Sequence, residues 1–253
     1  MAALDGRHAL VTGGSRGIGR AIAAVLAGAG AAVTIVGRNE ASLEEAVARG
    51  DARGFVKADV TDPRALLDGM ARAVAARGPV DILVANAGGA ESAPFAKADV
   101  DLFRRMFELN VMGTVHAARA VIGDMTARRF GRIVAVASTA GLKGYAYVSA
   151  YCAAKHAVVG LVRALALETA GSGVTVNAVC PGYTDTDLVR EGAARIAAKT
   201  GRGPEEALAA MAKNNPLGRL IAPAEVASAV LFLCSSDAAA ITGTTLTVAG
   251  GEL

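Results

Sequence analysis

Three side chains in the middle of the chain have the types and the spacing needed to move a proton to or from an oxygen atom. Tyr151 and Lys155 stand four positions apart on an expected helix, so they share one face. A phenol has an ordinary pKa of about 10, and a nearby ammonium lowers this pKa towards neutrality. Ser138 ends an apolar run, where its hydroxyl could hydrogen-bond a substrate oxygen and stabilise a developing alkoxide. The Tyr-Lys spacing alone is a weak signal, because such pairs arise on helices by chance.

A glycine-rich segment near the start of the chain could bind a pyrophosphate. Positions 12–19 read TGGSRGIG and lie between the first expected strand and the first expected helix. Glycines permit the tight turn and a close approach of the backbone, while N–H groups and the helix dipole face the anion. The alternative is an ordinary glycine-rich turn between a strand and a helix. We predict dinucleotide contacts from Gly13, Ser15, Arg16, Gly17, Ile18 and Gly19.

The end of the second expected strand distinguishes between the two nicotinamide dinucleotides. An acidic residue there would bind a ribose 2′-hydroxyl and repel a 2′-phosphate. The chain instead has GRN at 37–39. Arg38 can offer charge-assisted hydrogen bonds to a phosphate, and Arg16 can approach from the glycine loop. The sequence therefore favours NADP(H) over NAD(H); the alternative interpretation of Arg38 is a solvated surface charge.

The elements that must position these residues alternate along the chain. Short apolar runs predict strands, and longer Ala- and Leu-rich patterns predict helices. The expected strands cover 8–12, 32–36, 54–57, 82–85, 133–137, 175–179 and 245–248, and the expected helices cover 17–29, 41–49, 63–77, 99–128, 150–170 and 223–234. This order predicts an α/β Rossmann fold, a doubly wound parallel sheet of about seven strands with helices on both faces. Residues 1–253 are expected to form one domain.

One segment interrupts the alternation. Residues 183–215 form a polar, partly helical stretch after the sixth expected strand, at the end of the sheet where open α/β proteins bind ligands. We predict that this stretch is a substrate lid. Its cations could meet the phosphates of coenzyme A or the acidic face of a carrier protein, or they could simply be solvated; they are Arg190, Arg195, Lys199 and Arg202.

Composition limits the classes of partner. The chain has 26 Lys and Arg against 23 Asp and Glu, and this formal charge of +3 is too small and too scattered for a nucleic-acid surface. Its three cysteines, Cys152, Cys180 and Cys234, lack the spacing of a disulfide framework or of a zinc site. No signal-peptide pattern is found, and the apolar stretches are shorter than a membrane span requires. We expect a cytoplasmic protein with a small-molecule partner and no metal.

Taken together, these motifs resemble those of the short-chain dehydrogenase/reductase family, in its compact branch. The resemblance runs from the first strand to the C-terminus, with the motifs in the family's order. After the glycine loop come Asp59, Val60, Asn86, Ala87, Gly88, Asn110, Ser138, Tyr151, Lys155, Asn177, Pro181, Gly182, Thr186 and a closing Gly250 and Gly251. Two positions depart from the pattern: Ala85 stands where many relatives have asparagine, and Ala249 where many have aspartate.

The resemblance implies a role for each matching residue. Asn110 would kink its helix and hold a water joined to Lys155, completing a catalytic tetrad with Ser138 and Tyr151. Lys155 would also bind the nicotinamide ribose, beside Tyr151. The other cofactor contacts would come from Asp59, Val60, Asn86, Ala87, Gly88, Pro181, Gly182, Thr184 and Thr186. Relatives usually form homotetramers through the helices that correspond to 99–128 and 150–170 and through the C-terminal strand.

Within the family, the chain is similar to reductases of 3-oxoacyl thioesters, ketoreductases of aromatic polyketides and 3-hydroxybutyrate dehydrogenases. This implies hydride transfer between NADP(H) and a ketone or secondary alcohol. The substrate pocket is expected to be lined by Ala90, Ala140, Leu142, Val148 and Tyr183, with Tyr145 and Tyr147 either as further lining or as loop anchors against a neighbouring subunit. Dehydrogenases of free 3-hydroxybutyrate have polar or basic side chains where this chain has Ala90, Ala140 and Val148. A 3-oxoacyl thioester or a similar bulky ketone is therefore favoured over a small free acid.

Two alternatives stay open at this point. One is an NAD-dependent dehydrogenase of a hydroxy acid or of a cyclic or aromatic secondary alcohol. The other is a dinucleotide-binding sensor without catalysis. The second is disfavoured because proteins of that kind usually resemble the family with the tyrosine or the lysine lost, and this chain keeps both Tyr151 and Lys155.

Overall fold

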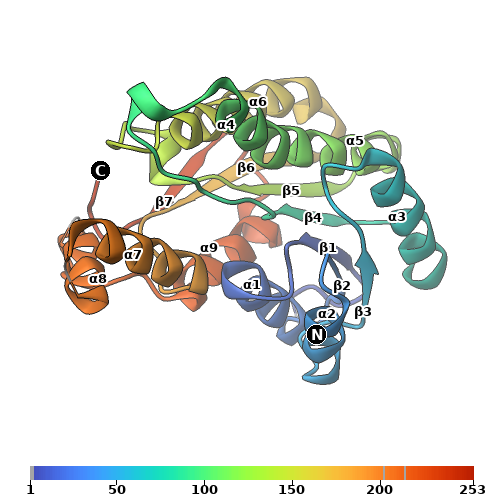
Figure 1. Ribbon diagram of the computed structural model, residues 1–253. Coiled ribbons are helices and arrows are strands. Elements are labelled where there is room, and N and C mark those ends of the chain that lie inside the picture. Colours follow the sequence, from blue (N-terminus) through green and yellow to red (C-terminus); the bar gives the residue numbers. More distant parts are fainter. Residues whose placement is uncertain (1–2, 202, 214) are drawn as a thin grey trace.

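The computed structural model describes residues 3–201, 203–213 and 215–253. Within them, one sheet contains seven parallel strands in the order β3-β2-β1-β4-β5-β6-β7 (Figure 1). The strands are β1 His8–Thr12, β2 Ala32–Gly37, β3 Gly54–Lys57, β4 Ile82–Ala85, β5 Gly131–Val136, β6 Val174–Pro181 and β7 Thr245–Val248. The predicted α/β fold with a doubly wound parallel sheet is confirmed.

The strands are apolar runs because helices cover both faces of the sheet. Every residue of β1, β4, β5 and β6 is buried. Alternate side chains of one strand enter different halves of the core, since successive residues of a strand point to opposite faces. On β1, Val11 belongs to the half that packs against α1, and Leu10 to the half that packs against α5 and α6.

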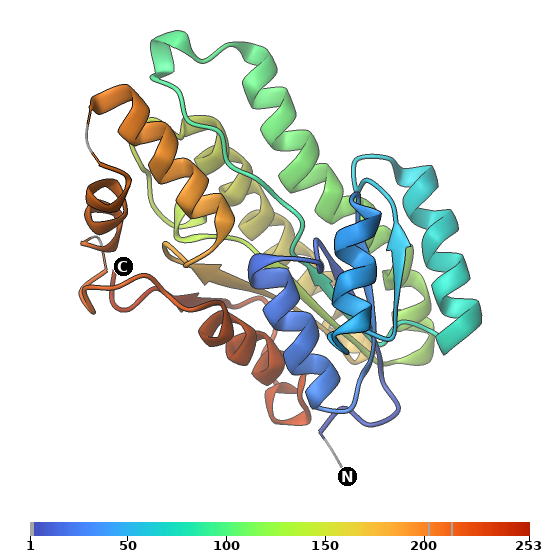
Figure 2. The ribbon, with the colours of Figure 1, turned by 60° about the horizontal axis from the view of Figure 1, so that its bottom comes forward.

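Helices form a layer on each face of the sheet (Figures 1 and 2). One layer contains α1 Gly17–Gly28, α2 Glu40–Ala48 and α9 Pro223–Cys234, and the other contains α3 Pro63–Arg77, α4 Val100–Phe107, α5 Gly113–Arg128 and α6 Ser149–Thr169. Their ends follow local signals. At the start of α3, for example, the Asp62 side chain accepts hydrogen bonds from the N–H groups of Arg64 and Ala65, and Pro63 occupies the first turn.

The predicted continuous helix over 99–128 is wrong in one respect. A π-helical turn, η2 Glu108–Met112, separates α4 from α5. The Asn110 side chain causes the interruption, because its Nδ2 donates both to the Met106 O and to the Gly89 O, each at 3.0 Å. Such insertions of a side chain into a helix ladder bend helices and are frequent at functional sites. The distortion implied for Asn110 by the family resemblance is present in this form.

Residues 183–215 leave the sheet as a largely helical excursion. It contains α7 Asp187–Thr200 and α8 Pro204–Ala212, which pack against each other beside the edge of the sheet (Figures 1 and 2). A β-bridge between Thr184 and Ile221 joins the start of the excursion to the segment that follows it. This geometry suits the predicted lid, whose closure over a substrate stays a prediction.

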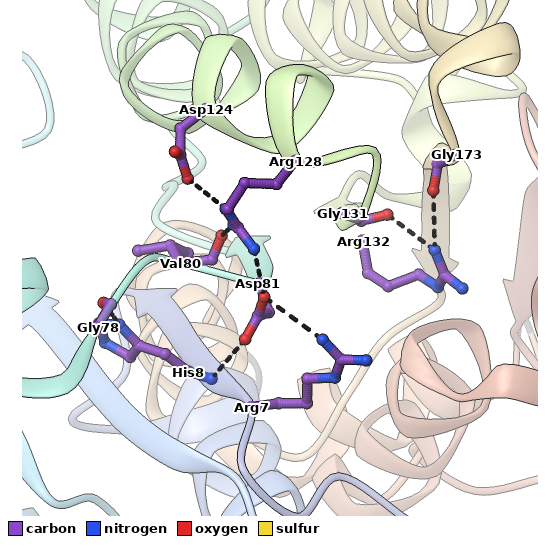
Figure 3. A network of polar contacts seen from close by, with 10 residues as sticks. All are labelled: Arg7, His8, Gly78, Val80, Asp81, Asp124, Arg128, Gly131, Arg132 and Gly173. Atoms are coloured by element: carbon purple, nitrogen blue, oxygen red, sulfur yellow. Dashed lines mark hydrogen bonds and ion pairs between the residues drawn. The ribbon is translucent and has the colours of Figure 1, made fainter.

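Charged and polar side chains fasten the amino ends of the central strands (Figure 3). The buried Asp81 accepts hydrogen bonds from the His8 N–H at 3.1 Å and from Arg128 Nη1 at 2.8 Å. The ring of His8 is buried between the Gly78 O, 2.8 Å from Nδ1, and the Thr34 Oγ1, 2.9 Å from Nε2. This network connects β1, β2, α5 and the loop before β4 at the edge away from the predicted site.

Among the described residues, one helical stretch, Ser149–Ser172, is long and apolar enough to cross a membrane. In an apolar window of 18 residues within it, 44% of the residues are buried inside the protein, where the helix packs against β6 and α4. The core helix of a soluble protein meets the same criterion. We attribute its apolar side chains to this packing.

The topology places the predicted site residues at one edge of the sheet. The chain runs from β1 outward to β2 and β3, then returns to β4 on the other side of β1. In open α/β sheets, ligands bind at this switch point, outside the carboxyl ends of the strands. The glycine loop follows β1, Asn86 follows β4, Ser138 follows β5 and Gly182 follows β6. Segments far apart in the sequence therefore meet at the same edge.

Candidate functional site

The glycine loop is closely packed where the sequence predicts a phosphate cradle. Gly13 and Gly17 adopt left-handed backbone conformations, with φ of +64° and +53°. A Cβ on Gly13 would lie 2.9 Å from Asn86 Nδ2, and one on Gly19 would overlap the Gly13 O. The loop therefore requires glycines, and it leads directly into α1, for which Arg16 is the N-cap residue. Such a loop can receive a pyrophosphate at the helix N-terminus.

Thr12 holds this loop to the end of β4, a role that the sequence reasoning missed. Its Oγ1 accepts from the N–H groups of Asn86 and Ala87, each at 3.0 Å. In return, Asn86 Nδ2 donates to the Thr12 O at 2.9 Å and to the Gly13 O at 3.2 Å. The only sequence signal was a hydroxyl at the start of the TGG motif. Asn86 and Ala87 thus fix the glycine loop against the end of β4, while their contact with a dinucleotide stays a prediction.

Arg38 and Asp59 form a pair at the predicted adenosine end of the site. Arg38 Nη1 lies 3.6 Å from Asp59 Oδ2, and the Arg38 side chain is 74% exposed. Burial alone would raise the pKa of Asp59, but hydrogen bonds from Thr61 and the charge of Arg38 lower it below its ordinary value. The neighbouring Val60 is buried, and its carbonyl is 2.9 Å from His116 Nδ1. The predicted adenosine end of the site therefore carries an anionic Asp59 beside the exposed guanidinium of Arg38.

Ser138, Tyr151 and Lys155 meet at the carboxyl ends of β5 and β6. Ser138 leaves β5 in an extended conformation, and its Oγ accepts from the Ala140 N–H at 3.1 Å. The Ser138 side chain lies close enough to the Tyr151 hydroxyl to lower the pKa of that phenol. Lys155 is 5% exposed, and its Nζ donates to the Val136 O at 2.9 Å. The structure brings the three predicted catalytic side chains together.

The expected effect of Lys155 on Tyr151 does not appear in the protein alone. Burial raises the pKa of Tyr151 to about 12, although the Ser138 side chain opposes this rise. Burial also lowers the pKa of Lys155 to about 8. Both shifts have the same cause, because a low-dielectric site disfavours the phenolate and the ammonium alike. The ammonium by itself does not compensate for the burial of the phenol.

Asn110 lies near Lys155, and Gly88 is between the two side chains. Its Oδ1 accepts from the Gly89 N–H at 3.3 Å. A Cβ on Gly88 would lie 2.7 Å from Asn110 Oδ1 and 3.5 Å from Lys155 Nζ. Gly88 therefore fills the narrow space between the amide and the ammonium. This juxtaposition suits the tetrad that the resemblance implies.

The segment after β6 links the catalytic side of the cleft to the glycine loop. Pro181 ends β6, and the Thr184 Oγ1 donates to the Gly182 O at 3.0 Å. Thr186 caps α7, and a Cβ on Gly17 would lie 3.3 Å from its Cγ2. The predicted cofactor-binding residues of this segment therefore lie between the catalytic group and the glycine loop, where a nicotinamide would bind. They are Pro181, Gly182, Thr184 and Thr186.

The predicted substrate-facing residues lie around the loop between β5 and α6. Ala140 is buried, whereas Ala90, Leu142, Val148 and Tyr183 are half-buried. Tyr145 is fastened within its own chain: its hydroxyl contacts Thr139 and Glu252, and its ring meets Tyr183 edge to face at 6.2 Å between centroids. Tyr147 is 67% exposed with a φ of +69°. The Glu252 contact was missed, because one acid in the closing GGEL carries no sequence signal.

The lid cations take local partners where the structure describes them. Arg190 Nη2 lies 2.6 Å from Asp185 Oδ1, and Arg195 Nη1 lies 3.9 Å from Glu191 Oε2. Arg202 and the Lys199 side chain lie outside the described residues. The predicted contact of these cations with a ligand phosphate stays a prediction.

These features fit a nicotinamide dinucleotide. The glycine loop has no room for side chains where a pyrophosphate would lie, and a buried ammonium stands beside a half-buried phenol at the other end. The residues suited to hold the dinucleotide run from the glycine loop and Arg38, past Asn86, to Lys155 and Thr186. When bound, the nicotinamide would supply or accept a hydride.

Comparisons with known proteins agree with this arrangement. A model of the short chain dehydrogenase family matches residues 7–196. The chain is 41% identical over 249 residues to the acetoacetyl-CoA reductase of Rhizobium meliloti (strain 1021), covering 97% of this chain and 98% of that protein. It is 42% identical over 249 residues to the cis-4-hydroxycyclohexanecarboxylate dehydrogenase of Sinomonas cyclohexanicum, covering 97% and 96%.

A similar fold occurs among solved structures. The crystal structure of a variant of actinorhodin polyketide ketoreductase with NADPH matches with a TM-score of 0.94 and 36% identity. The match covers 100% of this chain and 99% of the ketoreductase. The similarity thus includes the lid segment and the C-terminal tail.

Proposed function

Because the chain belongs to the short-chain dehydrogenase family, we propose that it transfers a hydride between NADP(H) and a 3-oxoacyl thioester or a similar bulky ketone. By its reaction class, without regard to the cofactor or the particular substrate, the protein is an oxidoreductase that acts on a ketone or a secondary alcohol. The observation that carries the proposal is the meeting of Ser138, Tyr151 and Lys155 beside Asn110, at the same sheet edge as the glycine loop.

The proposed reaction assigns a task to each side chain. Ser138 Oγ holds the substrate oxygen, and the Tyr151 hydroxyl gives its proton to that oxygen as the carbonyl carbon is reduced. Lys155 Nζ, within 5.7 Å of the Tyr151 ring, stabilises the phenolate left behind. Asn110 holds the helix distortion and the backbone of Gly89 in place at the inner end of this group.

Support for NADP(H) comes from charge at the adenosine end. The exposed Arg38 guanidinium follows β2, and Arg16 is exposed on the glycine loop. Arg38 can exchange its 3.6 Å contact with Asp59 for a bidentate contact with a 2′-phosphate. The related ketoreductase structure is described with NADPH.

The proposed substrate class rests on the apolar side chains and on the relatives. Ala90, Ala140 and Val148 offer no cation for a free carboxylate. One relative is named for acetoacetyl-CoA, and another is a polyketide ketoreductase. A second candidate is the oxidation of a cyclic secondary alcohol, which the 42% identity to a hydroxycyclohexanecarboxylate dehydrogenase favours.

The assembly and the location belong to the same proposal. We place the protein in the cytoplasm as a homotetramer that associates through α4, α5 and α6 and through the C-terminal strand β7. Phe107 and Met112 are exposed apolar side chains near the junction of α4 and α5, which supports helix packing there.

The test is a panel of substrates followed by the absorbance of reduced nicotinamide. Acyl thioesters, cyclic ketones and aryl ketones are offered with NADPH and with NADH, and the matching alcohols with the oxidised cofactors. The proposal expects NADPH oxidation with acetoacetyl thioesters or bulky ketones. Turnover of cyclic alcohols with NAD alone would favour the second candidate, and no turnover in any arm would contradict both.

A further inference from the structure

The C-terminal tail, residues 249–253, packs against three segments of the candidate site. It follows β7, and the Gly182 N–H donates to the Val248 O at 3.1 Å, so the tail starts next to the segment that borders the predicted nicotinamide site. A turn follows, in which the Glu252 N–H donates to the Ala249 O at 3.2 Å. The C-terminus lies near α8 in both views of the ribbon (Figures 1 and 2).

The first contact of the tail is with the end of the lid. Gly250 and Gly251 have left-handed backbones, with φ of +60° and +88°. A Cβ on Gly250 would overlap the Asn215 side chain, and one on Gly251 would lie 3.4 Å from Pro216 Cγ. Asn215 is 4% exposed, and its Oδ1 accepts from the Leu217 N–H at 2.9 Å. The two glycines therefore let the tail backbone lie directly on the turn that ends the lid.

The second contact is with the loop between β5 and α6. The Glu252 side chain is 1% exposed, and its Oε1 contacts the Tyr145 hydroxyl and lies 3.4 Å from Lys143 Nζ. The same Nζ donates to the Glu252 O at 2.9 Å. Because a carboxylate only accepts, Tyr145 donates to Glu252, and the Thr139 Oγ1, 2.7 Å from the phenol oxygen, donates to Tyr145. The tail is thus connected to the residue that directly follows Ser138.

The third contact is with the segment after β6. A Cβ on Gly182 would lie 2.7 Å from Glu252 Oε2 and 3.1 Å from Ala249 Cβ. The Tyr183 ring meets the Tyr145 ring edge to face, with 6.2 Å between the centroids. Since the lid starts at Tyr183, the tail and its partner Tyr145 contact both ends of the lid.

These contacts connect the two parts of the predicted substrate wall. Ala140, Leu142 and Val148 belong to the loop between β5 and α6, whereas Tyr183 belongs to the lid. A wall built from two loops keeps a fixed shape only when neighbouring residues hold both loops in place. The tail touches both, and the Glu252 carboxylate carries its contact with the first.

We propose that Glu252 is a positioning residue for the substrate wall, which holds the loop between β5 and α6 at a fixed position relative to the lid through Tyr145 and Lys143. This inference rests on the proposed function of the same site. Glu252 acts on the ketone only through these two side chains. Its loss should therefore weaken the binding of the ketone more than the chemical step, and it should leave the binding of the cofactor unchanged.

Three substitutions test the connection at its two ends. Glu252→Ala removes the carboxylate, and Tyr145→Phe removes the hydroxyl that the carboxylate binds while the ring stays. Glu252→Gln keeps an oxygen that can accept from Tyr145, so it is the conservative variant. Combining Glu252→Ala with Tyr145→Phe shows whether the two residues act as one unit.

A fourth substitution disturbs the tail where it meets the lid. In Gly250→Ala the new methyl group would overlap the Asn215 side chain, and the left-handed φ of +60° would be strained. Gly6→Ala is the matched control, because Gly6 has a φ of +74° and nothing lies within 4 Å of its Cβ position. The two variants share the backbone strain and differ in the overlap.

The kinetic readout uses an acetoacetyl thioester with NADPH. Glu252→Ala and Tyr145→Phe should each raise the KM of the thioester at least about tenfold, with kcat within about threefold of the wild type. The double variant should be no worse than the more impaired single variant, because both changes break the same contact. Glu252→Gln should recover most of the loss. The Kd of NADP⁺, measured by calorimetry, should not change in any of them.

Hydrogen–deuterium exchange of the protein with NADP⁺ gives a readout that needs no substrate. Glu252→Ala and Gly250→Ala should both speed the exchange of residues 139–147 at least about tenfold, and Gly6→Ala should not. The methyl group of Gly250→Ala would meet Asn215 and not the loop, so an effect on 139–147 has to pass through the tail.

An unchanged KM in Glu252→Ala overturns the inference, and so do additive losses in the double variant. A weaker affinity for NADP⁺ that accounts for the whole effect also overturns it. If Glu252→Ala does not fold, Tyr145→Phe and Gly250→Ala carry the same comparison. If the thioester and the other ketones of the panel are not reduced, the proposed function fails. The exchange of 139–147 then decides on Glu252 separately, and an unchanged rate in Glu252→Ala counts against it.

Discussion

The Lys155 ammonium lies 5.7 Å from the centre of the Tyr151 ring, and its Nζ is held by the Val136 carbonyl at 2.9 Å. The lysine is thus fixed by the end of β5, the strand that also leads to Ser138. Burial shifts the pKa of Tyr151 up to about 12 and that of Lys155 down to about 8. Perturbed groups that converge at one sheet edge are typical of a catalytic site.

Removing the Tyr151 hydroxyl tests this group directly. We expect Tyr151→Phe to bind NADPH with an affinity close to that of the wild type and to lose at least about 100-fold in kcat, because the proton donor is gone while the ring still packs. Stopped assays of turnover and a fluorescence titration with NADPH measure the two effects. Turnover near the wild-type rate would falsify the assignment of Tyr151.

Arg38 should decide the preference between cofactors. Arg38→Asp places a carboxylate at the end of β2, next to Asp59, so it should repel a 2′-phosphate and accept from a 2′-hydroxyl. We expect the ratio of kcat/KM for NADPH to that for NADH to fall by about 100-fold. Arg72→Asp, on an exposed position of α3, makes the same charge change as a control. An NADPH preference that survives in Arg38→Asp would show that other residues carry it.

The Thr12 hydroxyl should matter more than an ordinary buried hydroxyl. Thr12→Val removes the acceptor for the N–H groups of Asn86 and Ala87, so we expect a loss of about 1–3 kcal/mol in the free energy of unfolding and weaker NADPH binding. Thr175→Val is the matched control, since the buried Thr175 Oγ1 has no partner among the described residues. Urea unfolding of both variants provides the comparison. Equal losses in the two variants would contradict the role of Thr12.

His8 should make the fold sensitive to mild acid. Burial lowers its pKa from 6.5, in spite of the hydrogen bond to the Gly78 carbonyl. The unfolded imidazole therefore takes up a proton near pH 6.5 while the folded one does not, and the free energy of unfolding falls as the pH drops below 6.5. The slope from this one proton is at most about 1.4 kcal/mol per pH unit.

The measurement is urea unfolding at a series of pH values between about 7.5 and 5, the range in which histidine titrates. His8→Gln keeps a polar side chain without a titrating group, so its stability curve should be flatter below pH 6.5. Parallel curves for the two proteins would assign the acid sensitivity to other residues.

The sequence by itself determined the order and the ends of most elements. Strand 54–57, strand 245–248, helix 63–77 and helix 223–234 agree with the structure to the residue. Their signals are local: the α3 boundary, for instance, depends on a capping Asp62 directly before Pro63. Apolar periodicity and turn residues act over a few positions, so they can be recognised without the fold.

The catalytic group was recognisable for a related reason. Tyr151 and Lys155 are neighbours on one helix, and Ser138 follows an apolar strand, so their types and spacing are visible in the printed chain. The pKa values of Tyr151 and Lys155, in contrast, could not be read from the sequence. The sequence suggested that Lys155 lowers the pKa of Tyr151, whereas burial raises it, because burial depends on every element packed around the pair.

Tertiary structure alone decided the contacts between distant segments. Asn110 interrupts its helix by donating to Gly89, 21 positions earlier, and Thr12 meets Asn86 across 74 positions. Glu252 meets Tyr145 across 107 positions, at the same edge of the sheet. These contacts arise because the strand order 3-2-1-4-5-6-7 gathers the carboxyl ends of the strands. Only the folded chain shows which polar atoms are paired there and which buried ones, like Glu252 Oε2, have no hydrogen-bond partner among the described residues.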